Sequence, residues 1–252
     1  MNFQIALLLG QDGVTNGAIY ALLALSILLV FTVTRILLIP QGEYVTYGAL
    51  TMAALQAGQP TALVWLLLGL TLIDCSLDLI GALRSGHAFR LPRWVPVKLL
   101  YAVVMVLLVR NLPLAELPMA LQALLTLALV VPLGPQIYRL FFQPVAGAHP
   151  LVLLIVSIAV HVAMVGVGLL LFGPEGARTR PFSEAGLELG PVTLNSQTLW
   201  VIAVSLMLII SLFLFFERSL YGKALRATAV NRMGARLMGI SPTLAGKATF
   251  AM

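Results

Sequence analysis

Long apolar stretches separated by short polar segments occupy almost the whole chain. Most of these stretches have about the 20 residues that a helix needs to cross a hydrocarbon core of about 30 Å. The apolar residues are consecutive rather than alternating, which favours helices over membrane strands. The pattern predicts an all-α, polytopic transmembrane helix bundle with about seven spans, at residues 13–37, 43–58, 61–83, 97–112, 115–137, 150–172 and 198–217.

The composition supports a membrane protein and excludes several other classes. Of the 252 residues, 60% are apolar and 10% are charged, whereas a soluble domain has about 45–50% apolar and about 25% charged residues. A soluble domain, a disordered chain and a nucleic-acid-binding protein are therefore excluded. The single cysteine, Cys75, excludes a disulfide scaffold and a thiolate metal cluster.

The basic residues are unevenly divided between the two sides that seven spans create. Twelve lie on one side, and only Arg110, Arg178 and Arg180 lie on the other. Cytoplasmic loops carry an excess of Lys and Arg. We therefore expect the N-terminus and the 173–197 loop outside, and the 218–247 loop in the cytoplasm. We interpret residues 1–252 as one transmembrane domain that is truncated at its C-terminus, because a new apolar run begins at Ala248.

The 218–247 segment contains a helical pattern of apolar residues. Residues with the spacing i, i+3, i+7 and i+8 share one helical face; here these are Val230, Met233, Leu237 and Met238. Gly239 is expected to end this helix in a left-handed conformation. Ser241 and Pro242 are expected to begin the next one. Such a helix either docks into a groove of a cytoplasmic partner or rests on lipid headgroups.

Four segments of the chain carry a family resemblance. The resemblance covers roughly residues 13–58 and 136–252, while residues 59–135 match poorly. Together, the segments resemble LivH-like permeases of the branched-chain amino-acid ABC importer family. The four segments are Asn16–Ala24, Gln41–Thr51, Pro150–Ser157 with Leu171–Pro174, and Leu225–Pro242.

This resemblance implies a permease subunit of an ATP-driven importer for branched-chain or related small amino acids, in the bacterial cytoplasmic (inner) membrane. Its partners would be a second permease subunit, cytoplasmic ATPase subunits and an external substrate-binding protein. The chain has no Walker-type phosphate loop, so we expect ATP on the partner and no cofactor on this subunit. The resemblance also makes residues 224–240 a coupling helix that contacts the ATPase through Ala227, Ala229, Ala235, Gly239 and Ile240.

Polar residues inside the spans supply further candidates. Asp74 and Asp78 lie four residues apart and share a helix face. One interpretation is a proton or cation relay in a secondary transporter or channel. The alternative, which we favour, is structural: Asp78 pairs with Arg84, and Asp74 is bonded inside the bundle.

A second group of candidates concerns the transport pathway and helix packing. A lone histidine in a span, His161, is expected to bond to a neighbouring helix. Gly13, Gly17 and Ala21 form a ridge suited to close helix packing. We expect no metal site and no catalytic set. The pathway candidates are Asn16, Tyr20, Gln41 and Gly42.

Overall fold

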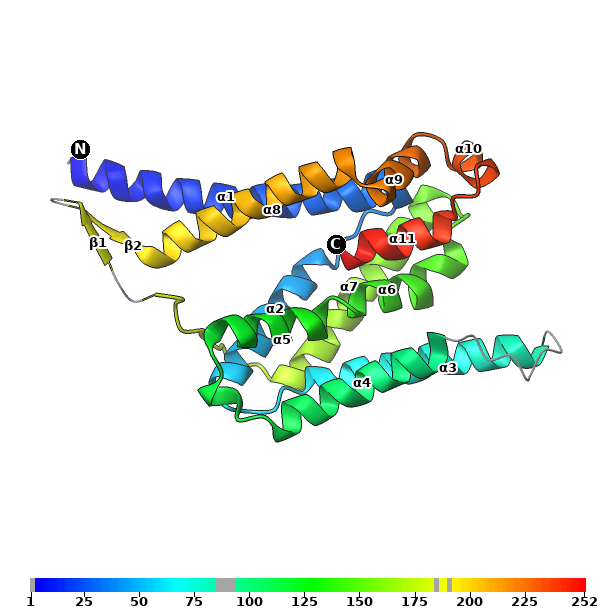
Figure 1. Ribbon diagram of the computed structural model, residues 1–252, viewed down its shortest axis with the longest axis horizontal. Coiled ribbons are helices and arrows are strands. Elements are labelled where there is room, and N and C mark those ends of the chain that lie inside the picture. Colours follow the sequence, from blue (N-terminus) through cyan, green and yellow to red (C-terminus); the bar gives the residue numbers. More distant parts are fainter. Residues whose placement is uncertain (1–2, 85–93, 184–185, 190–191) are drawn as a thin grey trace. The chain divides into compact units, whose positions relative to one another are not determined.

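The computed structural model describes residues 3–183, 186–189 and 192–252, except for residues 85–93. It is helical apart from one short hairpin (Figure 1). The first helices are α1 (Phe3–Thr34), α2 (Gln41–Gln56), α3 (Leu63–Arg84), α4 (Trp94–Asn111), η1 (Leu114–Glu116), α5 (Met119–Val130), α6 (Leu133–Ile137), η2 (Tyr138–Phe142) and η3 (Gln143–Val145). They are followed by α7 (Pro150–Phe172), β1 (Gly186–Leu189), β2 (Val192–Asn195), α8 (Ser196–Arg218), α9 (Leu220–Val230), α10 (Arg232–Leu237) and α11 (Pro242–Ala251).

The helices confirm the predicted fold class. Each of the seven predicted apolar stretches coincides with a helix or a run of helices. Within the described residues, five segments are long and apolar enough to cross a membrane: Leu8–Thr34, Leu63–Leu83, Met119–Val145, Pro150–Phe172 and Ser196–Arg218. The helix α2 has only 16 residues, so it is shorter than an ordinary crossing.

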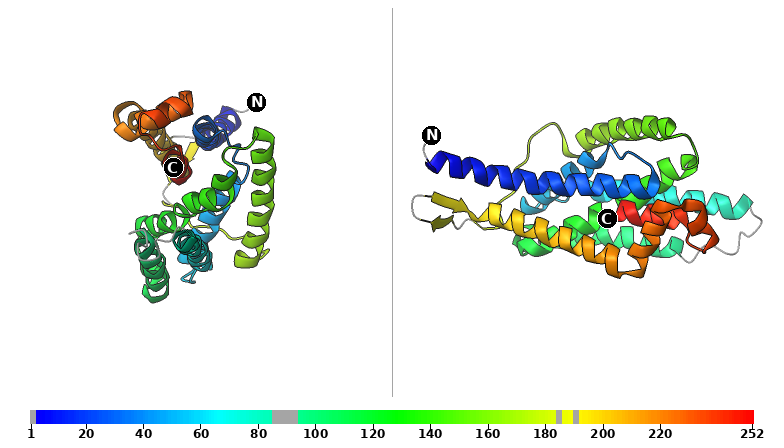
Figure 2. Two further views of the ribbon diagram at one scale, coloured as in Figure 1. Left: turned by 90° about the vertical axis from the view of Figure 1, so that its right-hand side faces the viewer. Right: turned by 90° about the horizontal axis from the view of Figure 1, so that it is seen from above.

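The chain folds into two compact units, one formed by residues 1–35 with 180–245 and the other by 36–179 with 246–252. In the first unit, α1 and α8 run side by side (Figures 1 and 2). Where α9 meets this pair, Val33, Leu225 and Ala245 form a buried apolar cluster that Phe215 and Phe216 cover. This cluster joins the end of α1 to the segment that follows α8.

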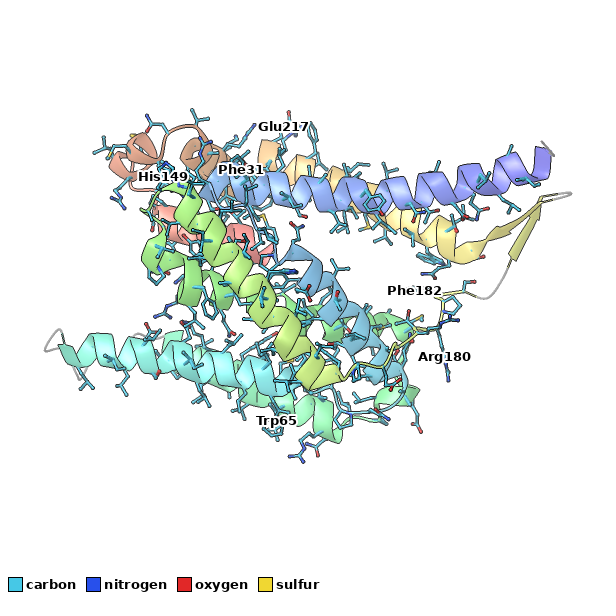
Figure 3. The ribbon with its side chains drawn as sticks, turned by 180° about the vertical axis from the view of Figure 1, so that it is seen from behind. Phe31, Trp65, His149, Arg180, Phe182 and Glu217 are labelled. Carbon is cyan, nitrogen blue, oxygen red and sulfur yellow. The ribbon has the colours of Figure 1, made fainter. Side chains whose placement is uncertain are left out.

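The first unit also contains the antiparallel hairpin of β1 and β2, with Leu187 opposite Leu194. The apolar pattern did not predict these strands, because they lie in the 173–197 loop rather than in an apolar stretch. Residues 184–185 and 190–191 of that loop lie outside the described residues. The neighbouring Phe182, labelled in Figure 3, stacks 6.4 Å from the ring of Trp200 on α8.

The second unit contains α2 to α7 and the end of α11. Its helices are joined by hydrogen bonds from side chains to backbone: the Tyr47 hydroxyl on α2 donates to the Met164 carbonyl on α7 at 2.6 Å. The Ser157 hydroxyl donates to the Leu37 carbonyl at 2.6 Å and accepts from the Ile39 amide at 3.0 Å. The side chain of His149, labelled in Figure 3, caps the start of α7 by accepting from the Leu151 amide.

Candidate functional site

The loop after α8 consists of two short helices rather than one. The helix α9 ends at Val230 because Asn231 has an extended backbone, with φ −147° and ψ 101°. The Asn231 side chain then accepts from the Gly234 amide at 2.9 Å and begins α10. The prediction of one continuous helical face from Val230 to Met238 is therefore wrong. Asparagine favours this break because its side chain replaces a missing backbone partner at a helix start.

The end of this loop confirms the sequence prediction. Gly239 has φ +82°, the left-handed conformation that glycine adopts at low cost. Its amide donates to the Arg236 carbonyl, and the Ile240 amide donates to the Ala235 carbonyl at 2.9 Å. These two bonds form a Schellman motif. Pro242 then begins α11, as predicted.

The loop is tied to the end of α1 within the first unit. The Arg232 guanidinium donates to the carbonyls of Val33 and Thr34 at 3.2 and 2.9 Å. The Arg35 guanidinium reaches the Ala229 carbonyl at 3.5 Å. The last carbonyls of a helix lack hydrogen-bond partners within it. Arg232 therefore supplies donors to the carbonyls at the end of α1. A displacement of α10 must therefore disturb the end of α1.

The loop exposes large apolar side chains. Four residues of α9, α10 and the turn that follows form what we call the loop apolar surface: Val230, Met233, Leu237 and Met238. Leu237 and Met238 are each 82% exposed, and Val230 is 86% exposed. Large exposed apolar groups close together are typical of an interaction site.

The five residues assigned to the ATPase contact by resemblance differ in exposure. Ala227 and Gly239 are exposed, while Ala229 and Ile240 are half-buried. Ala235 is only 5% exposed and packs inside its own unit. The exposed side chains of the loop therefore include the four of the loop apolar surface, whereas Ala235 is buried.

The pathway candidates lie on the first two helices. Asn16 and Tyr20 are exposed on α1, and Tyr20 is 69% exposed. Gln41 and Gly42 begin α2, where Gln41 is half-buried and Gly42 is exposed.

The small-residue ridge on α1 makes no close helix contact among the described residues. A side-chain carbon added to Gly13 or Gly17 would meet no heavy atom within 4 Å among the described residues. The expected close packing is therefore not found within the described part of this chain.

Asp74 and Asp78 belong to a network of four charged residues in the second unit. Asp74 is 2% exposed; its Oδ2 lies 2.7 Å from Lys98 Nζ and its Oδ1 lies 2.6 Å from Arg139 Nη1. Asp78 Oδ2 accepts from Arg139 Nη1 at 2.9 Å and lies 3.5 Å from Lys98 Nζ. Arg139 Nη2 also contacts Asp78 Oδ1. The network joins α3, α4 and η2 through two acids and two bases.

This network confirms that Asp74 is bonded inside the bundle but changes the expected partner of Asp78. Its cations are Arg139 and Lys98, whereas the side chain of Arg84 lies outside the described residues. Sequence spacing pointed to Arg84 because it is near in the chain. It gave no signal for Arg139, 61 residues away.

A second contact joins α2 and α7. His161 Nδ1 lies 3.5 Å from Glu43 Oε1. This approach brings His161 near a neighbouring helix, but its Nδ1 makes no hydrogen bond among the described residues, so the expected bond is not established. Among the described residues, no group of three His, Cys, Asp or Glu side chains could hold a metal ion.

A family model described as branched-chain amino acid transport system / permease component matches residues 11–252. The chain belongs to this family. No curated protein and no solved structure matches it significantly. The match includes residues 59–135, where the sequence resemblance was poor, and so covers the charged network as well as the loop. Five segments of the described residues are long and apolar enough to cross a membrane, so the chain is a multi-pass membrane permease component.

Proposed function

We propose that this permease is the transmembrane subunit of an ATP-driven importer for branched-chain or related small amino acids. It works with a second permease subunit, cytoplasmic ATPases and an external binding protein, in a bacterial cytoplasmic membrane. ATP is bound by the ATPase partner. The N-terminus lies outside and residues 218–247 lie in the cytoplasm, as the distribution of basic residues predicts.

One observation carries the coupling assignment: the loop that exposes apolar side chains is also bonded to the end of a spanning helix. A partner bound to Leu237 and Met238 would move α10, and Arg232 connects α10 to the last carbonyls of α1. A loop that only rested on lipid would need the exposed apolar groups but not this connection. The contact therefore supports transmission of ATPase movement to α1.

The secondary-transporter alternative receives less support. A proton or cation relay needs a carboxylate that is open to its ion. Both carboxylates of the network are already paired with Lys98 and Arg139.

The test is ATP hydrolysis by the reconstituted complex with and without loaded binding protein. Leu237→Ala should leave the permease folded, because this side chain is 82% exposed. Truncating an interface anchor costs more than about 1 kcal/mol, so ATPase affinity should fall roughly fivefold or more. Stimulation by the binding protein should fall with it.

Leu170→Ala is the matched control. Leu170 is 86% exposed on α7, outside the loop, so its truncation should leave ATPase affinity unchanged. Ala235→Trp is less informative, because Ala235 is buried and a larger side chain would disturb the loop itself. If Leu237→Ala keeps full ATPase affinity and stimulation, the coupling assignment is wrong and the lipid-facing interpretation of the loop stands.

A further inference from the structure

A cavity of about 340 Å³ lies beside the charged network in the second unit. Three basic side chains line it, from α4, η2 and α11: Lys98, Arg139 and Lys247. Asp74, Tyr101 and Gln136 add polar groups. Prolines and Val97 make the rest of the wall apolar. A mostly apolar cavity with a few convergent charges is the usual form of a small-molecule site.

The charges of this cavity do not cancel. Asp74 Oδ2 and Oδ1 lie against Lys98 and Arg139, respectively, so this carboxylate is covered by cations. The network of two acids and two bases is neutral by itself. Lys247 adds one positive charge, and among the described residues no carboxylate lies within ion-pairing distance of it.

Lys247 is held in this position by close backbone packing. A side-chain carbon on Gly246 would lie 2.9 Å from Tyr138 Cε1, and one on Gly134 would lie 2.8 Å from the Phe250 carbonyl carbon. The Phe250 ring stacks 4.9 Å from that of Tyr138. This packing fixes the backbone of α11, so the helix cannot carry the half-buried Lys247 away from the cavity into solvent. Burial lowers the pKa of Lys247, and the charges of Arg139 and Lys98 act in the same direction, while those of Asp74 and Asp78 oppose them. An anion beside it would relieve this unfavourable environment.

The cavity also borders an apolar surface. Val97, which lines it, is 58% exposed, and Leu100, one turn further along α4, is 64% exposed. Both belong to a helix of a membrane protein, so their environment is acyl chains or another subunit. A ligand with an anionic head and apolar tails would fit the charges and this surface together.

We propose that this cavity binds the phosphate of an anionic phospholipid headgroup, with Lys247 supplying the uncompensated charge. Basic pockets between transmembrane helices on the cytoplasmic side are known to hold such headgroups. The distribution of basic residues places Lys98, Arg139 and Lys247 on that side. The lipid would bridge α4 and α11, because these helices supply the apolar rim and Lys247. This inference goes beyond the proposed transport function and shares with it only the orientation that the basic residues predict.

The test is native mass spectrometry of the full chain after incubation with phosphatidylglycerol or phosphatidylcholine. The protein should retain phosphatidylglycerol and lose phosphatidylcholine. A lysine near a membrane surface contributes about 1 kcal/mol to anionic-lipid binding, or roughly a fivefold change in affinity. Lys247→Gln should therefore weaken phosphatidylglycerol retention roughly fivefold. Lys247→Arg, which keeps the charge, should retain it.

Lys223→Gln is the matched control, because Lys223 is exposed on α9 and lines no part of this cavity. It should bind phosphatidylglycerol like the parent. Equal retention by Lys247→Gln and the parent would overturn the proposal. Displacement of the lipid by an equal concentration of inorganic phosphate would identify a free-anion site and would also overturn the lipid assignment. Neither outcome changes the ATPase measurement, so the two proposals can fail separately.

Discussion

The loop of residues 219–241 and the charged network around Asp74 are built from different kinds of contact. The helix starts and ends within the loop depend on partners close in sequence: Ser219 accepts from the Gly222 amide, three residues on. Arg232 adds a distant connection to the end of α1. The network joins residues far apart in sequence: Lys98 and Asp74 are 24 positions apart, and Arg139 and Asp78 are 61 positions apart. Local contacts are visible in sequence spacing, whereas contacts of this range are not.

The two regions also differ in which side chains they expose and which they bury. The loop leaves Leu237 and Met238 exposed, although it is expected to lie in water. The network buries Asp74 to 2% exposure, although charge is costly inside a membrane. An exposed apolar surface needs a partner, while a buried charge needs a fixed counterion. The first is therefore suited to assembly and the second to holding helices together.

The largest expected effect comes from breaking the network. In Asp74→Asn, Lys98 and Arg139 are left to share Asp78, so a half-buried positive charge loses its buried counterion. Removing one partner of a buried ion pair costs about 3–5 kcal/mol. We expect the unfolding free energy of the detergent-solubilised permease to fall by about that amount, measured by thermal and denaturant unfolding.

Asp12→Asn is the control, because Asp12 is exposed on α1 and its loss should be nearly neutral. The double variant Asp74→Asn/Lys98→Gln should be destabilised by less than the sum of the single variants, since the two residues interact. A structural role also predicts uptake that withstands a proton uncoupler while ATP is maintained. Additive losses, or uptake that collapses with the uncoupler, would contradict this role.

The same comparison explains which features of the fold and the site could be predicted from the sequence. Apolar stretches identified the helices, because crossing a membrane imposes a length and a composition that can be counted. Gly239 and Pro242 were predicted correctly, because each acts through its own backbone. The partners of Asp78 were not predictable, because they depend on how α3, α4 and η2 meet. The break at Asn231 was missed although its signal was present: asparagine is a common helix cap, but the apolar period continued across it.

A smaller effect should follow from changing the turn that begins the loop. A side-chain carbon on Gly222 would lie 2.6 Å from Phe216 Cα and would clash with the Phe215 carbonyl oxygen. Backbone cannot move aside as a flexible side chain can, so Gly222→Ala should cost about 1–3 kcal/mol. We expect a lower midpoint of thermal unfolding together with weaker ATPase binding, since the whole loop follows this turn.

Gly69→Ala provides the matched control for that substitution. Gly69 lies within α3, where an added carbon meets nothing within 4 Å, so alanine should be neutral or stabilise the helix by up to about 1 kcal/mol. If Gly222→Ala unfolds at the same temperature as Gly69→Ala, close contact between α8 and α9 is not what shapes the loop.

The smallest expected effect tests whether the side-chain cap of Asn231 holds α10 in place. Asn231 is exposed, so replacing it removes little packing and mainly removes the bond to the Gly234 amide. Loss of a helix cap costs about 1 kcal/mol, which should speed amide exchange across residues 232–238 roughly fivefold in Asn231→Ala. Asn231→Asp keeps an acceptor and should exchange like the parent, while the buried network around Asp74 should be unaffected in both variants. Equal exchange in Asn231→Ala and Asn231→Asp would mean that Arg232 alone, through its bonds to the end of α1, holds α10 in place. The loop would then depend on distant partners just as the network does.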